Sequence, residues 1–262
     1  MYAIISDLHS NLEALTAVME DIRSQGIGEI VCLGDVVGYG PDPEACVDIV
    51  QRDCRFCLSG NHDYAVLTRP ERFNPLATEA VEYTRRRMLP NGARGGWRKM
   101  LGFNRARLEH RWRFLEEQLP DKRELDFHYV HGSPRDNRNE YILETDVTFG
   151  NTEKIRDIFG MIPRVCFVGH SHVPGIVTDD FEFLSPADLE DELTFEDGRK
   201  YIVNVGSVGQ PRDADNRACY ATVDGQTLRY RRVEYDYKAT MRKMKAVGPL
   251  SEQLADRLEQ GR

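Results

Sequence analysis

The first 63 residues alternate apolar runs with amphipathic stretches, and this alternation limits the fold more than any other feature of the chain. After Asn11, a suitable N-cap, apolar residues from Leu12 to Ile22 recur at helical spacing, and residues 43–52 favour a second helix. Three runs predict buried strands: residues 2–5, 29–33 and 55–58. The order strand, helix, strand, helix, strand predicts a parallel sheet with right-handed crossovers.

Polar side chains follow each predicted strand, at the edge where an open α/β sheet gathers its functional groups. Two later apolar runs, residues 125–130 and 165–168, end in the same way. The side chains are Asp7 and His9, then Asp35, then Asn61, His62 and Asp63, then His131, and finally His170 and His172. We therefore expect these groups to meet at one edge of the sheet.

Spacing also predicts which of these side chains share a direction. In extended backbone, residues two apart point to the same side, so Asp7 and His9 are expected to face one point. The same argument applies to His170 and His172. His128 lies three residues before the end of its strand and is expected to face the other way, as a core or surface histidine.

The donors at the strand ends suit metal ions. Carboxylate, imidazole and amide groups together favour divalent transition metals, and the set is too rich in nitrogen for magnesium. There are enough donors for two ions, which we expect to be Mn, Fe, Ni or Zn. Two ions about 3.5–4 Å apart stabilise both the attacking and the leaving oxygen of a phosphoryl displacement. A carboxylate is expected to bridge them, because its two oxygens can neutralise both charges.

In this order and spacing, the motifs resemble those of the calcineurin-like metallophosphoesterases, and most of all the small bacterial and archaeal phosphodiesterase branch. The motifs are Asp7-Leu8-His9, Gly34-Asp35, Gly60-Asn61-His62-Asp63, His131-Gly132, Gly169-His170-Ser171-His172 and the loop 204–212. The resemblance implies an α/β fold, a four-layer α/β/β/α sandwich of two mixed sheets, with a binuclear metal site at the carboxyl ends of the strands. Short strands with turn signals between residues 176 and 235 independently predict a second, antiparallel sheet packed on the first.

The resemblance also implies a role for each residue. Asp7, His9 and His172 would hold one ion. Asn61, His131 and His170 would hold the other, and Asp35 would bridge the two. His62 would bind no metal but protonate the leaving oxygen, oriented by Asp63. Arg135 and Arg212 are candidate contacts for a phosphate, although ordinary surface solvation explains each of them equally well.

The leading hypothesis is a hydrolase of phosphodiesters or phosphomonoesters, in which a metal-bound hydroxide attacks phosphorus in line. Its partner is expected to be a small phosphorylated substrate, with a nucleotide as one candidate. The alternatives are a diadenosine polyphosphate hydrolase, a Ser/Thr phosphoprotein phosphatase, or a non-catalytic interaction scaffold of the same fold. His62 favours an enzyme, because a scaffold has no use for a group that protonates a leaving oxygen.

Composition narrows the class of protein. The 262 residues, 40% hydrophobic and 30% charged, are expected to form one domain over residues 1–262, and the formal net charge of −8 argues against a general nucleic-acid surface. No apolar run is long enough to cross a membrane, and Met1 leads almost directly into the first strand, so a cytoplasmic location is expected. The six scattered cysteines are interpreted as buried free thiols.

Three segments carry uneven charge. Residues 85–113 contain ten lysines or arginines against one acid and are expected to form a basic helical insertion. They provide either a solvated helix face or a flap that gathers anionic substrate. Residues 179–197 are strongly acidic, and part of this stretch is a candidate insertion. Residues 237–262 form a charged tail of helical tendency, broken at Gly248-Pro249.

Overall fold

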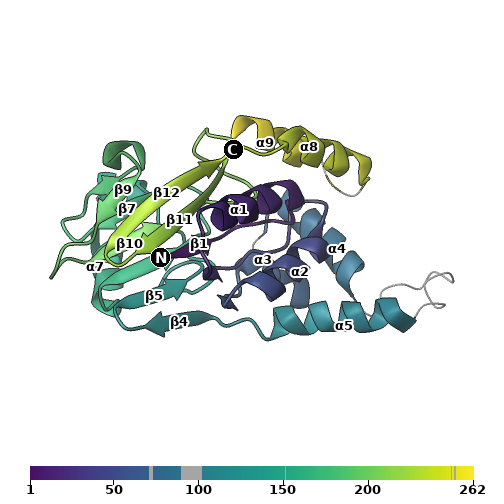
Figure 1. The fold of residues 1–262 in the computed structure, drawn as a ribbon, viewed down its shortest axis with the longest axis horizontal. Helices are drawn as coiled ribbons and strands as arrows, with labels where there is room; N and C mark the ends of the chain where they lie inside the picture. The colour runs from purple at the N-terminus through teal and green to yellow at the C-terminus, as the bar shows by residue number, and fades with distance from the viewer. Residues whose placement is uncertain (71–72, 90–101, 151, 249, 251) are drawn as a thin grey trace.

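Two six-stranded mixed sheets pack face to face, and helices cover their outer faces (Figure 1). The computed structural model describes residues 1–262 except 71–72, 90–101, 151, 249 and 251. A shared apolar core lies between the sheets, and separate cores lie between each sheet and its helices. The predicted four-layer α/β/β/α sandwich is therefore confirmed.

The first sheet contains the amino-terminal parallel strands, extended by strands from the carboxyl-terminal part of the chain. β1 pairs with β2 in parallel and with β11 in antiparallel orientation. The order across the sheet is β3 (Phe56–Cys57), β2 (Ile30–Cys32), β1 (Tyr2–Ile5), β11 (Ala218–Asp224), β12 (Thr227–Val233) and β9 (Glu192–Thr194).

The second sheet is built from the middle of the chain. β5 and β10 both pair in parallel with β6, while β4 and β7 pair in antiparallel orientation with β5 and β10. The order is β4 (Asp121–Glu124), β5 (Phe127–Val130), β6 (Val165–Val168), β10 (Tyr201–Asn204), β7 (Gly175–Thr178) and β8 (Phe183–Leu184).

β1 shows why these strands are continuously apolar. Ile4 faces the core between the sheets, whereas Ala3 and Ile5 face the core under the helices, and all three are fully buried. In the second sheet, Phe167 faces the inner core and Cys166 the outer core beneath α7. Because both faces of each central strand are covered, neither face is left for polar residues.

The helices follow the sequence pattern closely. Asn11 caps α1 as predicted, its side chain accepting a hydrogen bond from the Ala14 N–H at 3.2 Å, and the apolar face of the helix packs on the first sheet. The helices are α1 (Leu12–Ser24), α2 (Pro43–Asp53), α3 (Asn61–Leu67), α4 (Pro75–Met88), α5 (Gly102–Glu116), α6 (Thr145–Thr148), α7 (Thr152–Met161), the short 3-10 helix η2 (Ala187–Leu189), α8 (Tyr237–Ala246) and α9 (Glu252–Gln260).

One expectation about the strands is wrong, and one strand was not expected. The late hairpin β11–β12 does not join a separate antiparallel sheet but extends the first sheet beside β1. β4 is also unexpected, because its sequence Asp-Lys-Arg-Glu contains no apolar residue. An edge strand of this kind is held by backbone pairing to β5 and leaves its side chains half-buried or exposed, so no hydrophobic pattern announces it.

The described part of the basic segment is packed against its neighbours. Arg107 and Arg111 on α5 both bind Asp48 of α2, at 2.7 and 2.6 Å, and Arg87 on α4 binds Glu44 of α2. These pairs favour a docked helical face over a flap for the described residues, since α2 neutralises much of the charge. Residues 90–101, the glycine-rich centre of the expected flap, lie outside the described residues.

The two other charged segments are also built into the fold. β8, η2 and β9 lie within the acidic stretch, and β8 and β9 extend the edges of the two sheets. The predicted break in the tail separates α8 from α9; α8 packs on α1, and α9 packs on α8 (Figure 1). Leu254 and Leu258 of α9 pack in one cluster with Tyr39 and Ala80, so the tail supports the loop that follows β2.

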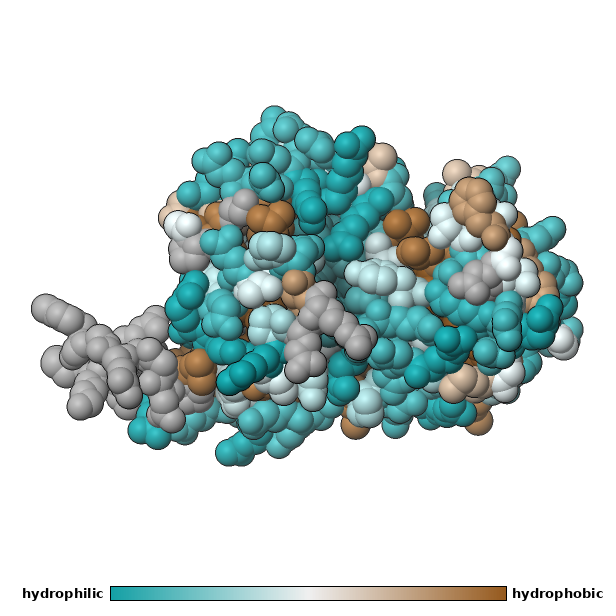
Figure 2. All heavy atoms as spheres, turned by 180° about the vertical axis from the view of Figure 1, so that it is seen from behind, coloured by the Kyte–Doolittle hydropathy of each residue, from teal (hydrophilic) through white to brown (hydrophobic). Residues whose placement is uncertain are grey.

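The remaining expectations concern thiols and membranes. All six cysteines are free; five are buried, and Cys54 is half-buried. Among the described residues, no helix has the length and apolar content needed to cross a bilayer. One face of the molecule is mainly hydrophilic, with apolar side chains in small scattered groups (Figure 2).

Candidate metal centre and active site

The chain turns sharply at the strand ends that carry the predicted ligands. Asp7, His9, Asp35, His170 and His172 all have positive φ values, between 49° and 65°. The premise that residues two apart converge in extended backbone is therefore wrong, because β1 ends at Ile5 and β6 at Val168. The side chains converge through left-handed loop conformations. Asp and His tolerate this region better than most residues, and such strain concentrates at functional sites.

Glycine permits the close approach of these loops. A Cβ at Gly60 would overlap Oδ1 of Asp35, and one at Gly169 would lie 2.5 Å from Oδ2 of Asp7. Both glycines precede predicted ligands, so the backbone of one strand end passes directly against a carboxylate of another.

Gly60→Ala is expected to destabilise the protein by about 1–3 kcal/mol, the usual cost of forcing an extra methyl group into a packed site. The measurement is urea unfolding, with metal content determined on the same samples. Gly28→Ala is the matched control, because a Cβ there meets no atom within 4 Å. Equal stability of the two variants would show that the Gly60 loop yields without disturbing Asp35.

The first group of donors consists of Asp7, His9 and His172, all buried. Nε2 of His9 lies 3.0 Å from Nε2 of His172. Oδ1 of Asp7 lies 3.2 Å from Nε2 of His172 and 3.8 Å from Nε2 of His9. The structure therefore brings together the three residues expected to hold one ion.

The second group contains Asp35, His131 and His170, with Asn61 beside them. Nε2 of His131 lies 3.2 Å from Oδ1 of Asn61 and 3.4 Å from Oδ2 of Asp35. The same Asp35 oxygen is 3.7 Å from Nε2 of His9, so it faces both groups. Oδ1 of Asp35 instead accepts the His62 N–H at 2.8 Å. One oxygen of Asp35 thus faces both groups, and the other is held by the backbone of His62.

Backbone carbonyls fix the tautomers of four histidines. Because a carbonyl only accepts hydrogen bonds, the ring nitrogen that faces it must carry the proton, and the other nitrogen keeps a lone pair. Nδ1 donates in His9, His131 and His172, to Val37 O at 3.2 Å, Leu33 O at 3.1 Å and Gln210 O at 2.6 Å. In His170 it is Nε2 that donates, to Asn139 O at 3.2 Å. When these rings are neutral, each therefore offers one lone pair to a cation.

The atoms of the first group cannot hydrogen-bond to one another, and a cation between them would interact favourably with all of them. With Nδ1 protonated in both rings, Nε2 of His9 and of His172 present lone pairs to each other and cannot hydrogen-bond. Oδ1 of Asp7 is buried and has no hydrogen-bond partner among the described residues. A buried carboxylate oxygen facing nitrogen lone pairs is unfavourable unless a positive charge lies between them.

Burial and the nearby carboxylates determine which of these histidines are charged. Burial lowers the pKa of His9 and His172, and it lowers the pKa of His170 to about 3, so these rings are neutral near pH 7. Burial also acts against a charge on His131, but the carboxylates of Asp35 and Asp7 outweigh it and raise the pKa of His131 to about 9. A positive charge is therefore stabilised at the second group, where Asp35 meets His131.

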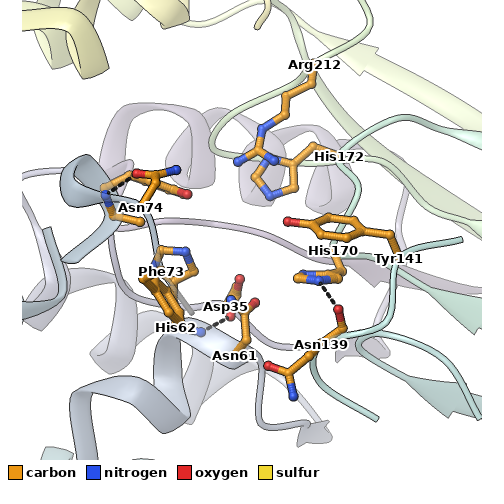
Figure 3. Close-up of a pocket in the computed structure, with 12 residues that line it drawn as sticks. Asp35, Asn61, His62, Phe73, Asn74, Asn139, Tyr141, His170, His172 and Arg212 are labelled. Carbon is orange, nitrogen blue, oxygen red and sulfur yellow. Dashed lines mark hydrogen bonds between the residues drawn. The ribbon is translucent and has the colours of Figure 1, made fainter. Parts of the chain in front are cut away.

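A pocket of about 290 Å³ opens beside the two groups (Figure 3). His62 and Phe73 lie on one side of it, and Tyr141 and His170 on the other, with Tyr141 stacked on His170 at 3.9 Å between ring centroids. The lining residues are Asp35, Tyr39, Asn61, His62, Phe73, Asn74, Ala77, Asn139, Tyr141, His170, His172 and Arg212.

His62 stands at the edge of this site, held by aromatic rings. Its ring lies 4.5 Å from that of Tyr39 and 4.8 Å from that of Phe73. Nδ1 is buried without a hydrogen-bond partner among the described residues. Burial lowers the pKa of His62 to about 4, although Asp35 opposes the shift. His62 also forms a group with His9 and Asp35 that could hold a metal ion.

Asp63 holds two loops together and forms no hydrogen bond or ion pair with His62 in the part of the chain that the structure describes. Its carboxylate accepts hydrogen bonds from the Val37 N–H at 3.1 Å and the Gly60 N–H at 3.3 Å. Burial, together with Asp35, raises the pKa of Asp63 to about 7. Any influence of Asp63 on the His62 ring passes through the backbone that it holds.

The two candidate arginines differ in position. Arg212 lines the pocket, with its guanidinium 5.9 Å from the ring of Tyr39. Arg135 instead pairs with Glu140 and Asp157, each at 3.2 Å, and is not among the residues that line the pocket. Arg212 therefore lies at the pocket, whereas Arg135 belongs to a surface ion-pair network.

Sequence reasoning missed the aromatic wall of the pocket. Tyr39 carried a weak signal, since it stands between glycines in the loop after β2. Phe73 and Tyr141 follow no predicted strand, and no motif marks them. They reach the pocket because their loops pack over the strand ends, which only the tertiary structure shows.

Fold and site together define a two-sheet α/β protein with buried His/Asp clusters that could hold metal ions. The chain belongs to the calcineurin-like phosphoesterase family, whose sequence model matches residues 2–174. It is 36% identical to the uncharacterized protein MJ0912 of Methanocaldococcus jannaschii, over 100% of this chain and 98% of the relative.

Solved structures agree with this assignment. A metallophosphoesterase from Sphaerobacter thermophilus is 35% identical, with a TM-score of 0.77, covering 100% of this chain and 98% of that one. The hypothetical protein PH1004 from Pyrococcus horikoshii OT3 is 18% identical, with a TM-score of 0.73 and the same coverage, and shares the fold.

Proposed function

We propose that the protein is a binuclear metal-dependent phosphoesterase that cleaves small phosphodiesters. The observation that carries the proposal is the position of Asp35, whose Oδ2 lies 3.7 Å from Nε2 of His9 and 3.4 Å from Nε2 of His131. One carboxylate oxygen thus faces two separate donor groups, the arrangement that a pair of ions requires.

In this proposal, Asp7, His9 and His172 would hold one ion, Asn61, His131 and His170 would hold the other, and Asp35 would serve both. Nitrogen-rich donor sets of this kind suit Mn, Fe, Ni or Zn. When bound, the two ions would offset the negative charge on the phosphate oxygens and would lower the pKa of water, so that water could act as a nucleophile near pH 7.

The residues of the pocket perform the rest of the reaction. Arg212 binds a phosphate oxygen, and His62 gives a proton to the leaving oxygen while the rings of Tyr39 and Phe73 hold it in place. An anionic ester beside the buried His62 favours its protonated form. Arg212 is the guanidinium among the lining residues, and its single charge matches a diester better than a doubly charged monoester.

The purified protein is expected to contain two equivalents of transition metal, and chelation is expected to abolish hydrolysis of bis(p-nitrophenyl) phosphate. Elemental analysis and rates before and after dialysis against a chelator test this, with reloading by single metals as the control. Full activity in protein stripped of metal would contradict the proposal.

A further inference from the structure

An apolar cavity of about 190 Å³ lies on the outer side of the second sheet. Its floor consists of the buried side chains of Val168, Val177 and Ile202, which belong to the core between this sheet and α7. Its rim is exposed and includes Glu144 and Thr145. Among the described residues, the cavity and the pocket of the candidate active site share no lining residue. The cavity is therefore a separate place at which a molecule can bind.

The size and lining of the cavity indicate a small, uncharged aromatic ligand. An apolar cavity of about 150 Å³ is large enough to take benzene. The ring of Phe183 forms one wall, and it lies so close to the backbone that a Cβ at Gly175 would be 2.2 Å from it. Such a ring favours contact with another aromatic ring. Glu144 is the one charged side chain among the described lining residues, so a buried carboxylate on the ligand would find no cation there.

Ser171 provides the cavity with a hydrogen-bond donor. This residue lines the cavity and is only 5% exposed. Its Oγ accepts hydrogen bonds from Nδ2 of Asn204 at 2.9 Å and from the Val173 N–H at 3.3 Å, and it donates none to any described residue. Because a hydroxyl group has two lone pairs and one hydrogen, only the hydrogen is left without a partner. An oxygen acceptor on the ligand, such as a carbonyl, would satisfy it.

Two walls of the cavity are continuous with the segments that position His170. Ser171 directly follows His170 in the chain. Another wall comes from residues 142–145, which directly follow two contacts of the same histidine. Tyr141 stacks on the His170 ring with 3.9 Å between ring centroids, and Asn139 O accepts the hydrogen bond from Nε2 of His170 at 3.2 Å (Figure 3). The position of the His170 ring is therefore linked to the shape of the cavity.

We propose that the cavity binds a small, uncharged aromatic molecule with one acceptor oxygen, and that metal bound at the second group of donors strengthens this binding. Because an ion held by His170 would also fix Tyr141 and Asn139, it would order the wall that follows them. A ligand that meets an ordered wall loses less conformational entropy on binding. The coupling is reciprocal, so the ligand raises the affinity for metal by the same factor. This inference rests on the metal centre of the proposed function but not on the reaction.

The test compares two probes of similar size and shape, acetophenone and ethylbenzene, of which only acetophenone has an acceptor oxygen. Their dissociation constants are measured by isothermal titration calorimetry on metal-free and metal-loaded protein. We expect acetophenone to bind about fivefold more tightly than ethylbenzene, the usual effect of one additional neutral hydrogen bond. We also expect metal-loaded protein to bind acetophenone about fivefold more tightly than metal-free protein, at the lower end of the usual range of coupling between two sites.

Two variants determine whether the probes bind in this cavity. Val177→Phe fills the floor and is expected to abolish the binding of both probes. Ser171→Ala removes the donor and is expected to lower the affinity for acetophenone about fivefold while leaving that for ethylbenzene unchanged. The matched control is Ser24→Ala, an exposed serine of α1 outside the cavity, which is expected to change neither affinity. Thermal unfolding of each variant identifies losses caused by misfolding.

The outcomes separate this inference from the function on which it rests. Equal affinities of the wild type for the two probes, or no saturable binding of acetophenone, would overturn the site whatever the variants do. Binding that a folded Val177→Phe variant retains would also overturn it, because the probes would then bind elsewhere. Equal affinities of metal-free and metal-loaded protein would overturn the coupling. If the protein takes up no metal, the metal centre and the coupling are both wrong, and the two probes still decide whether the cavity binds a ligand.

Discussion

Asp35→Asn is expected to lose metal from both donor groups and to lower kcat for an aryl phosphodiester by about 10³-fold, since metal ions contribute several kcal/mol to the transition state. The reason is that one Asp35 oxygen faces His9 in the first group and His131 in the second. Without the charge of Asp35, less negative charge faces a cation in either group, so both groups are expected to bind a metal ion less tightly. Elemental analysis and steady-state rates on the same preparation measure the two effects.

Asp7→Asn provides the comparison. Oδ1 of Asp7 has no hydrogen-bond partner among the described residues and lies closer to His172, in the first group, than to His131, in the second. This change is therefore expected to lower the occupancy of one ion more than that of the other. Asp35→Asn should therefore be the more damaging of the two. If Asp35→Asn kept both ions and activity near that of the wild type, Asp35 would not be shared.

His62→Ala is expected to keep both ions and to lower kcat by about 10²–10⁴-fold, the usual range for a general acid. The loss should grow with the pKa of the leaving group. A nitrophenolate departs without a proton, so its deficit should be small, whereas an alkoxide or ribose oxygen needs the proton. The measurement is kcat for wild type and variant along a series of esters of rising leaving-group pKa.

Two results would change the role given to His62. Equal losses along the series would mean that it stabilises charge on the phosphate instead of donating a proton. Loss of a metal ion would make it a ligand, a role that its grouping with His9 and Asp35 makes structurally accessible. His110→Ala is the control, because His110 is exposed on α5 and does not line the pocket.

The layered fold was predictable because burial on both faces leaves a clear pattern in the sequence. β6 occupies the predicted residues 165–168, and α1 begins at the predicted cap, Asn11. β4 could not be found in this way, since an edge strand of charged residues has no apolar period. The pairing of β11 with β1 could not be predicted either. A buried strand is apolar whichever strands lie beside it, so its sequence does not reveal its neighbours.

The donor groups were predictable for a similar reason: they follow strands that the sequence reveals. Their conformations were not, since the left-handed turns at Asp7 and His170 depend on the loops packed against them. The side chains that shape the pocket were also hidden. Tyr141 reaches His170 from a loop between β5 and α6, and nothing in its local sequence indicates that contact.

Anomalous diffraction from crystals of the metal-loaded protein tests the binuclear centre most directly. Data collected on both sides of the absorption edge of the loaded metal would locate each ion. The expected result is two ions, one among Asp7, His9 and His172 and the other among Asn61, His131 and His170, with Asp35 between them. A single ion, or a second ion held away from Asp35, would contradict the binuclear centre.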